Sequence, residues 1–466
     1  MGFDVFIDSV REDIIKSTQE FIKIKSVEGE PQPGAPFGEG VGKALEYVLS
    51  LSQKMGFKTK NLDGYVGYAE IGEGDEIVGI LVHVDVVPEG MGWIYPPYGA
   101  EIHDGKLYGR GSIDDKGPTV SALYALKAVK ESDIDLNKRV RIIFGTNEES
   151  GWKCIKYYNE KEEMPTYCFV PDANYPIINS EKGILSFKLK KNFAKKDTGD
   201  IKILNIKGGE RSNMVPDYCK TELLCKIDEK VLFEKYKSFI NKTGYKIELK
   251  KQDDNTFVIE SFGTSAHAMT PEKGQNAICQ MIKFINQFDL GDSDIANFIS
   301  FLAKKIGMEH YGTSIGLEFE DKISGKLTLN LGVINFCEDN GFVELNIRYP
   351  VTYQQKYIID IIEKECLSAG LEITDVSNID PLFVPEDSLL VKKLKKVYEE
   401  VTGQEATLIS IGGGTYARAM KNAVAFGPVF PGKPELAHMK DEYIEIEDLI
   451  INAKIYARAI YELAGN

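Results

Sequence analysis

The fold is decided by the segment IVGILVHVD, residues 77–85, in which a short apolar run ends at His83 and Asp85. An apolar run of this length is typical of a strand that is buried on both faces of a parallel sheet. Side chains alternate along a strand with a period of two, so His83 and Asp85 are expected on the same side. The segment therefore predicts a buried strand that carries an imidazole and a carboxylate to one edge of a sheet.

Further apolar strands follow along the chain, and each of them has acidic residues close behind it. Residues 140–144 run toward Glu148 and Glu149, and residues 167–170 run into Asp172. Helical patterns of apolar residues lie between these strands. Regular alternation of strands and helices predicts an α/β layer with a mostly parallel central sheet.

The character of the sequence changes in the middle of the chain. Apolar and polar residues alternate strictly there, for example over residues 327–333, where every second residue is apolar. This alternation is typical of antiparallel strands with one face on the core. The α/β pattern then returns near the end. We expect one α/β domain, formed by residues 1–182 and 382–466, which is interrupted by an α+β domain of residues 183–381.

Composition and charge narrow the range of partners. The chain has 56 Lys and Arg against 71 Asp and Glu, a net charge of −15, and no run of basic residues. Nucleic acid and anionic membrane surfaces are therefore unexpected partners. No apolar stretch approaches the roughly 20 residues that span a bilayer. The acidic residues near the N-terminus and seven cysteines without a C-x-x-C pair predict a cytoplasmic protein.

Each of the polar groups also has an ordinary structural explanation. An acidic pair often begins a helix, and the segment GRGSIDDKG, residues 109–117, can be a glycine turn with capping aspartates. However, His83, Glu148, Glu149 and Asp172 all follow the carboxyl ends of predicted parallel strands, where α/β sheets bind ligands. Carboxylates that meet there repel one another unless a cation is present. Together with histidines they predict a site for one or two divalent ions.

The polar motifs, taken in order, resemble the co-catalytic metallopeptidase family that includes carboxypeptidase G, aminoacylase and the acetylornithine and succinyl-diaminopimelate deacylases. They are HVD (83–85), GRGSIDDKG (109–117), EE (148–149), Asp172 and HMKDE (438–442), together with SNMVP (212–216), GTSAH (263–267), NIR (346–348) and GGGT (412–415). The long inserted block resembles the bacterial Xaa-His dipeptidase (PepV-like) branch, since other members carry a shorter lid and dimerise through it. The resemblance implies a zinc-exopeptidase-like catalytic domain, a lid of two ferredoxin-like halves, and a monomer.

The resemblance also implies the ligands of two divalent metal ions. His83, Asp114 and Asp172 would hold one ion, and Glu149, His438 and the second oxygen of Asp114 would hold the other. On chemistry alone either Asp114 or Asp115 could bridge the ions; the family places the bridge at Asp114, with a cis peptide bond to the next residue. Zinc is the expected metal, with manganese or cobalt as alternatives, because imidazole and carboxylate ligands suit all three.

Three further residues receive catalytic roles from the resemblance. Glu148 would take a proton from the attacking water and pass it to the leaving amine. The carboxylate of Asp85 would accept the second ring N–H of His83 and so orient it. His267, in the inserted domain, would donate a hydrogen bond to the oxyanion.

The substrate-binding residues are also expected in or near the inserted domain. Chemistry alone favours a surface ion pair for Arg348, whereas the resemblance favours a guanidinium that holds a substrate carboxylate. Asn213 and the backbone at Gly413 and Gly414 would complete a short, closed pocket.

The resulting hypothesis is a dinuclear metal-dependent dipeptidase that hydrolyses short unblocked dipeptides with metal-activated water. An alternative is an N-acyl amino-acid deacylase that uses the same residues. A more remote alternative, from another functional class, is a non-catalytic peptide-binding protein on the same scaffold.

Overall fold

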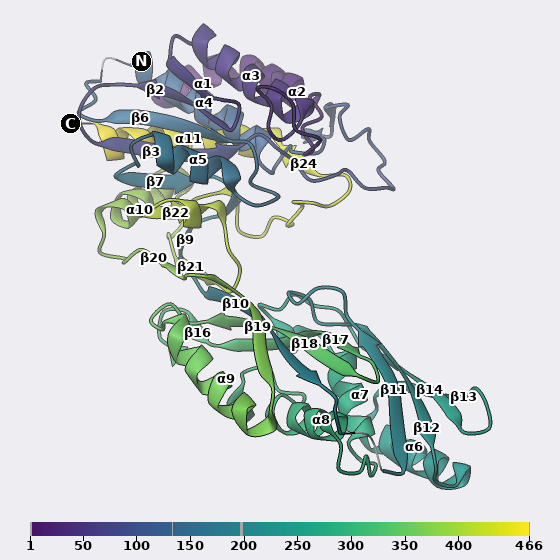
Figure 1. Ribbon diagram of the computed structural model, residues 1–466. Helices are drawn as coiled ribbons and strands as arrows, with labels where there is room; N and C mark the ends of the chain where they lie inside the picture. Colours follow the sequence, from purple (N-terminus) through teal and green to yellow (C-terminus); the bar gives the residue numbers. More distant parts are fainter. Residues whose placement is uncertain (1, 133, 196–198, 466) are drawn as a thin grey trace. The chain divides into compact units, whose positions relative to one another are not determined.

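The computed structural model describes residues 2–132, 134–195 and 199–465, and the chain divides into two compact units (Figure 1). The first, called here the α/β unit, consists of Met1–Asn179, Phe383–Ile409 and Gly414–Asn466. The second, the inserted unit, consists of Ser180–Leu382 and Ser410–Gly413. The boundaries fall within or beside three short strands, which are β9 (Ile177–Glu181), β20 (Leu382–Phe383) and β21 (Leu408–Ile411).

The centre of the α/β unit is a parallel sheet. Its four parallel strands lie in the order β6 (Arg139–Gly145), β3 (Ile77–His83), β7 (Tyr167–Val170) and β22 (Ala423–Ala425). Two strands add to it in antiparallel fashion beside β6, namely β2 (Val66–Ile71) and β1 (Lys58–Leu62). Every residue of β3 is buried, which explains its uninterrupted apolar sequence. The parallel sheet predicted from sequence is present at the centre, and antiparallel strands flank it on both sides, because β9 also pairs with β22 in antiparallel fashion.

Helices pack against this sheet and against one another. They are α1 (Phe3–Ser9), α2 (Arg11–Ile22), α3 (Glu39–Lys54), α4 (Lys116–Lys130), α5 (Lys153–Lys161), α10 (Leu389–Thr402) and α11 (Ile446–Ala464). The C-terminal α11 contacts α4, α10 and α1, so the two ends of the chain share one helical layer. No helix among the described residues combines the length and the apolar character that crossing a bilayer requires.

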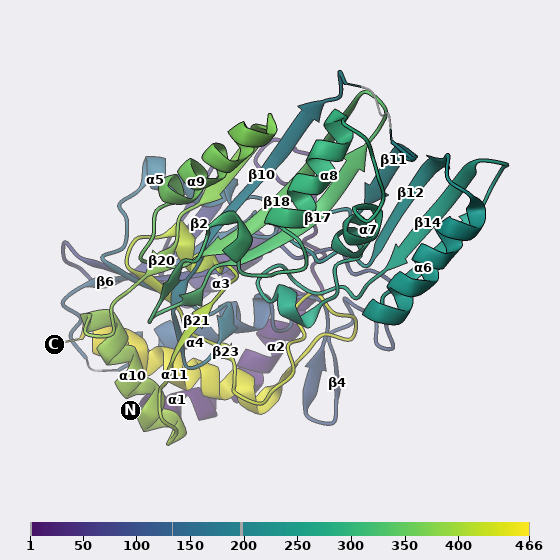
Figure 2. The ribbon, with the colours of Figure 1, turned by 90° about the horizontal axis from the view of Figure 1, so that it is seen from below.

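The inserted unit is built on one antiparallel sheet of eight strands. The strands are β10 (Gly183–Asn192), β11 (Ile201–Gly208), β12 (Tyr218–Cys225), β13 (Lys246–Lys251), β14 (Thr256–Phe262), β17 (Thr328–Phe336), β18 (Asn340–Tyr349) and β19 (Glu372–Ile379), in the spatial order β13-β14-β12-β11-β17-β18-β10-β19. Four helices lie over the same face of the sheet (Figure 2), and they are α6 (Glu229–Thr243), α7 (Ala277–Ile285), α8 (Asp294–Lys305) and α9 (Gln355–Ala369). One apolar core fills the space between helices and sheet.

The order of the strands divides this sheet into two ferredoxin-like halves. One half contains β10, α8, β17, β18, α9 and β19 in chain order, with the other half inserted between β10 and α8, and its strands lie in the order β17-β18-β10-β19. In the other half, β11 and β12 precede α6, β13, β14 and α7. Its spatial order, β13-β14-β12-β11, corresponds strand by strand to the order β17-β18-β10-β19 of the first half. The halves join edge to edge where Ile206–Gly208 pairs with Ile334–Phe336.

The strict alternation predicted for residues 327–333 is wrong at its end. The register between β17 and β18 shifts between Leu331 and Val333, so Val333 is half-buried and Ile334 takes the buried position. The shift lies at Gly332, where an added Cβ would meet Ser212 Cα at 2.4 Å. A bulge of this kind changes the phase of a strand, and here it lets the loop that carries the SNMVP motif approach the sheet closely.

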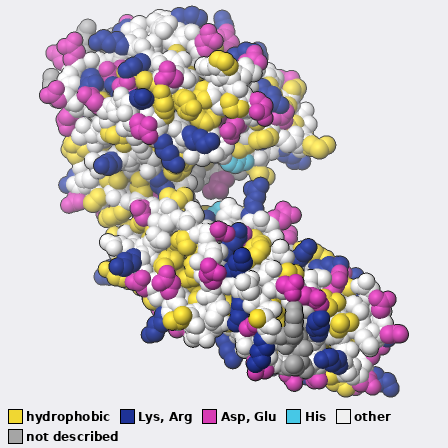
Figure 3. Space-filling model, viewed as in Figure 1, with side chains coloured by type: hydrophobic (Ala, Val, Ile, Leu, Met, Phe, Trp, Pro, Cys, Tyr) yellow, Lys and Arg dark blue, Asp and Glu magenta, His cyan; other side chains and the backbone are white. Residues whose placement is uncertain are grey.

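Acidic and basic side chains are interspersed over both units on the face shown in Figure 3. Neither sign of charge is confined to one unit on this face.

Candidate active site

The acidic residues and His83 meet at the carboxyl edge of the parallel strands. His83 is the last residue of β3, and the parallel register places it opposite Gly145, the last residue of β6. Glu148 and Glu149 follow three and four residues later, and Asp172 follows the end of β7. The structure therefore brings together the side chains that were predicted to meet because each of them follows a parallel strand.

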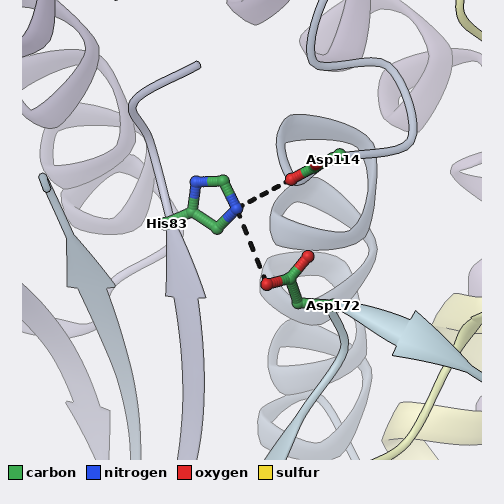
Figure 4. A group of neighbouring side chains, drawn as sticks. All are labelled: His83, Asp114 and Asp172. Carbon is green, nitrogen blue, oxygen red and sulfur yellow. Dashed lines mark hydrogen bonds and ion pairs between the residues drawn. The ribbon is translucent and has the colours of Figure 1, made fainter. Parts of the chain in front are cut away.

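One group of ligand atoms forms around the Nε2 atom of His83 (Figure 4). This nitrogen lies 2.9 Å from Oδ1 of Asp114 and 3.8 Å from Oδ2 of Asp172. The opposite ring nitrogen, Nδ1, donates a hydrogen bond of 3.0 Å to a backbone carbonyl. A proton fixed on Nδ1 leaves Nε2 as the atom that can bind a metal ion.

A second group shares Asp114 with the first. Oδ2 of Asp114 lies 3.1 Å from Nε2 of His438, and Oε2 of Glu149 lies at the same distance, 3.1 Å, from that nitrogen. Each oxygen of Asp114 thus faces a different histidine. The neighbouring Asp115 instead accepts a hydrogen bond of 3.1 Å from the backbone N–H of His83. The peptide bond between the two aspartates is cis, as the resemblance predicts.

Burial and mutual repulsion shift the pKa values of this cluster. Burial, followed by the charge of Asp114, raises the pKa of Asp172 to about 6. Burial also raises the pKa of Glu148 well above its usual value. Hydrogen bonds to Asp114 and Glu149 raise the pKa of His438 to about 10. The cluster therefore retains protons that bound cations would displace.

The chemistry of these side chains fits divalent cations. Two sets of three ligand atoms share Asp114, and they come from His83, Asp114 and Asp172 in one set and from Asp114, Glu149 and His438 in the other. A third combination, of His83, Glu148 and Glu149, overlaps both. The three ligand atoms of each group lie within 4.8 Å of one another. Imidazole nitrogen and carboxylate oxygen are common ligands of zinc, manganese and cobalt. A cation at each set would compensate charges that otherwise repel in a buried site.

Asp85 supports the cluster with different atoms from those predicted. The acceptor of the His83 Nδ1–H is the backbone carbonyl of Asp85, while its carboxylate Oδ1 lies farther away, at 3.6 Å. The two carboxylate oxygens instead accept hydrogen bonds, each of 3.1 Å, from the backbone N–H groups of Glu148 and Glu149. The prediction that the carboxylate orients His83 is therefore corrected: the carboxylate anchors the turn that carries the two glutamates.

A buried ion pair that the sequence did not reveal connects two segments of the site. Arg110 and Glu442 are 2% and 0% exposed, and their Nη1 and Oε2 atoms lie 2.6 Å apart. Glu442 Oε1 accepts the backbone N–H of Asp114 at 3.3 Å, and Arg110 Nη2 donates to the carbonyl of His438 at 3.2 Å. Removing either partner would leave a buried charge uncompensated. The pair thus fixes the backbone at two candidate ligands.

His267, in the inserted unit, has a defined tautomer. The backbone N–H of Met269 donates to its Nδ1 at 3.1 Å, so the ring proton of the neutral form is on Nε2. Burial, with a further contribution from the charge of Arg348, lowers the pKa of His267. Two backbone contacts hold the segment: His267 forms a bridge with Met214, and the N–H of the next residue, Ala268, donates to the carbonyl of Asn213.

Arg348 is buried, whereas chemistry alone predicted an exposed position on the surface. The residue is 4% exposed. Its Nε donates to Oδ1 of Asn346 at 2.8 Å and its Nη1 donates to the carbonyl of Gly412 at 3.0 Å. Burial contradicts the exposed position that chemistry alone favoured, and the role of Arg348 in substrate binding stays a prediction. Gly413 belongs to the inserted unit together with Arg348, whereas Gly414 belongs to the α/β unit.

The fold and the cluster define a class of hydrolase, and comparison with known families gives the same class. Residues 79–462 match the model of peptidase family M20/M25/M40. The chain belongs to this family and is a peptidase, an enzyme that hydrolyses peptide bonds. The family predicted from the motifs is confirmed.

Relatives of similar length support this assignment over the whole chain. The chain is 45% identical over 471 residues to "Putative dipeptidase YtjP" of Bacillus subtilis (strain 168), with 100% of both chains covered. It is 36% identical over 455 residues to "Putative dipeptidase" of Staphylococcus epidermidis, with 97% of each covered.

Solved structures show the same fold at low sequence identity. Aminoacylhistidine dipeptidase from Vibrio alginolyticus aligns with a TM-score of 0.60 and 14% identity over 96% of each chain. Human carnosine dipeptidase 1 aligns with a TM-score of 0.58 and 16% identity over 99% of this chain and 98% of the other. The predicted fold class, an exopeptidase-like α/β domain with an inserted α+β domain, is confirmed.

Proposed function

We propose that this peptidase is a dipeptidase that hydrolyses short unblocked dipeptides with two divalent metal ions and with Glu148 as the general base. The observation that carries the proposal is the position of Asp114, whose two carboxylate oxygens lie 2.9 Å and 3.1 Å from the Nε2 atoms of His83 and His438. A carboxylate between two imidazoles, with further acids on both sides, is suited to bridging two cations. The dipeptidase names of the relatives support the class of substrate.

The residues of the cluster divide into two sets of ligands. His83, Asp114 and Asp172 would hold one ion, and Asp114, Glu149 and His438 would hold the other. Bound there, divalent cations would polarise the scissile carbonyl and lower the pKa of a water molecule. Zinc is our first choice, with manganese and cobalt as alternatives, because each set offers one imidazole and two carboxylates.

Glu148 is suited to moving the proton. Burial raises the pKa of its carboxyl group well above the usual value. A base of this kind accepts a proton from water more readily than an exposed glutamate, and as the conjugate acid it delivers the proton to the leaving amine. Asp85 fixes the backbone of Glu148, which limits the positions that the carboxylate can take.

Residues of the inserted unit would bind the substrate. The Nε2–H of His267 is available to donate to the oxyanion, because Nδ1 is already an acceptor. The guanidinium of Arg348 would hold the free carboxylate of a dipeptide, since such a fork matches carboxylate geometry. Asn213 and the backbone of Gly413 and Gly414 would complete the pocket.

Two observations support a cellular setting and an assembly state for the proposed enzyme. All seven cysteines are free thiols, which supports a reducing compartment, and we propose the cytoplasm. The inserted unit already joins two ferredoxin-like halves edge to edge within one chain, which supports a monomer. Light scattering of the purified protein would test the monomer directly.

Glu148→Gln tests the mechanism. The amide cannot accept a proton, so we expect kcat to fall by about 10²- to 10⁴-fold, while elemental analysis still finds two equivalents of metal. Substantial turnover by this variant would contradict the proposal. The wild-type protein, stripped of metal and reloaded with zinc, manganese or cobalt in turn, should recover activity with at least one ion.

A substrate panel separates the dipeptidase from the deacylase. Free dipeptides and N-acetyl amino acids, assayed with the same reloaded protein, differ in whether the amine next to the scissile bond is blocked. We expect hydrolysis of the free dipeptides; exclusive hydrolysis of the acetylated compounds would favour the deacylase. The third hypothesis, a non-catalytic binding protein, is set aside because the chain belongs to a peptidase family.

A further inference from the structure

Trp152 is in direct contact with the proposed general base. Its indole Nε1–H donates a hydrogen bond of 3.0 Å to Oε1 of Glu148. The indole N–H can donate a hydrogen bond but cannot accept one. This contact therefore positions Oε1 of Glu148, and the indole cannot take a proton from the carboxyl group. No motif considered in the sequence contains this residue, and the mechanism described above does not use it.

The backbone at Trp152 adopts an uncommon conformation for a bulky residue. Its φ and ψ are 60° and 24°, in the left-handed region that non-glycine residues seldom occupy. Two contacts fix it there: the N–H of Trp152 donates to the carbonyl of Asn147 at 2.8 Å, and the N–H of Lys153 donates to Oδ1 of Asn147 at 3.1 Å. Strain of this kind persists where the surrounding structure enforces it, often at functional sites.

The indole ring rests against a buried aromatic side chain. The centroids of the Trp152 and Tyr416 rings are 5.8 Å apart. Tyr416 is 0% exposed and lies edge-on to the ring of His83 at 6.2 Å. Its hydroxyl group is 3.1 Å from the thiol of Cys154, the second residue of α5. The indole is therefore fixed both by its own backbone and by a rigid ring that also borders the cluster.

We propose that Trp152 is a positioning residue for Glu148. Its N–H occupies Oε1 and holds it in place, which leaves Oε2 as the atom that takes the proton from water. The inference rests on the proposed role of Glu148 as the base. It predicts that the indole N–H contributes to kcat and contributes little to KM, to metal binding or to folding.

Trp152→Phe removes the N–H and keeps an aromatic ring against Tyr416. We expect kcat to fall about 10- to 100-fold, as is typical when a partner of a functional side chain is lost, with KM, metal content and melting temperature within error of the wild type. Trp152→His, whose imidazole can donate, should restore part of the loss. The control is Trp93→Phe, since Trp93 is the chain's only other tryptophan and donates to a backbone carbonyl, that of Glu89, at 2.6 Å; its kcat should be unchanged.

A spectroscopic measurement tests the contact itself. In the Trp93→Phe background, Trp152 is the only tryptophan, so its emission reports the environment of the indole. We expect Glu148→Gln in this background to shift the emission, because the indole then donates to a neutral amide. An unchanged spectrum would overturn the proposal.

The outcomes distinguish this inference from the proposed function. If the wild type hydrolyses no member of the substrate panel, the proposed function fails, and the emission experiment still tests the contact between Trp152 and Glu148. If the wild type is active and Trp152→Phe has the same kcat, only the positioning role is overturned. A Trp152→Phe protein that loses metal and melting temperature together with kcat also overturns it, because the residue would then be structural.

Discussion

The two units hold their candidate functional residues in different ways. In the α/β unit, buried acids and histidines face one another, and the pKa values of Asp172 and His438 are displaced to about 6 and about 10. In the inserted unit, His267 and Arg348 are held by a backbone N–H, an amide oxygen and a backbone carbonyl. The charges of the cluster in the α/β unit are balanced only when cations bind. In the inserted unit, His267 and Arg348 already have hydrogen-bond partners within the protein. We therefore expect metal removal to disturb the α/β unit and to leave the pocket residues of the inserted unit in place.

The largest effect is expected from Asp114→Asn, which breaks the α/β cluster at the residue common to both ligand sets. An amide carries no charge to balance two cations, so the affinity for metal should fall by more than about 100-fold, with loss of activity. Elemental analysis and zinc titration by calorimetry measure this directly. His103→Gln is the control, because His103 pairs with Glu101 away from the cluster and should have no effect. Retention of two ions by Asp114→Asn would contradict the assignment.

An intermediate effect is expected from Arg348→Gln, which alters the inserted unit alone. Loss of a charge-assisted bond to a substrate carboxylate costs about 1.5–3 kcal/mol, so KM for free dipeptides should rise about 10- to 100-fold with unchanged metal content. Dipeptides whose terminal carboxylate is amidated provide the matched control, since wild type and variant should hydrolyse them equally. A change in metal content instead would mean that Arg348 supports the cluster.

The smallest effect concerns the titration of His267. Burial and Arg348 lower its pKa below the usual 6.5, so NMR of the ring should give a midpoint below 6.5 that is the same with and without metal. Since the unfolded chain then binds the proton more tightly, the contribution of His267 to stability is present above pH 6.5 and is lost as the pH falls. Arg348→Gln should move the midpoint back only in part, because burial is the larger cause. A midpoint above 6.5, or one that depends on metal, would contradict the comparison between the units.

The convergence of the acids could be predicted from sequence because it depends on a general rule. His83, Glu148, Glu149 and Asp172 each follow a parallel strand, and parallel strands end at one edge of the sheet. The Arg110–Glu442 pair follows no such rule: its residues are 332 positions apart, and nothing in either segment identifies the other as its partner. The carboxylate of Asp85 was assigned to the wrong group because residue spacing gives the side of a strand and not the acceptor atom.

Parts of the inserted unit were missed for other reasons. Helix α8 was not predicted, although its apolar residues recur at helical spacing and Ser293 caps its first turn by accepting the N–H of Ala296. That signal was available in the sequence. The bulge at Gly332 could not be predicted from the sequence, because it depends on the close approach of Ser212, which lies on another segment of the chain.

The order of the segments has a consequence for synthesis. Strand β22 completes the parallel sheet beside β7, and His438 and Glu442 complete the acid cluster and the buried ion pair, yet all three come from the last part of the chain. A ribosome delivers the N-terminal segments first. A nascent chain that has reached residue 400 already contains His83, Asp114 and Asp172, but it lacks the partner histidine and the glutamate that fixes the Asp114 backbone. The enzyme we propose is thus inert until the segment that carries His438 and Glu442 has been synthesised, and it gains its hydrolytic capacity only then.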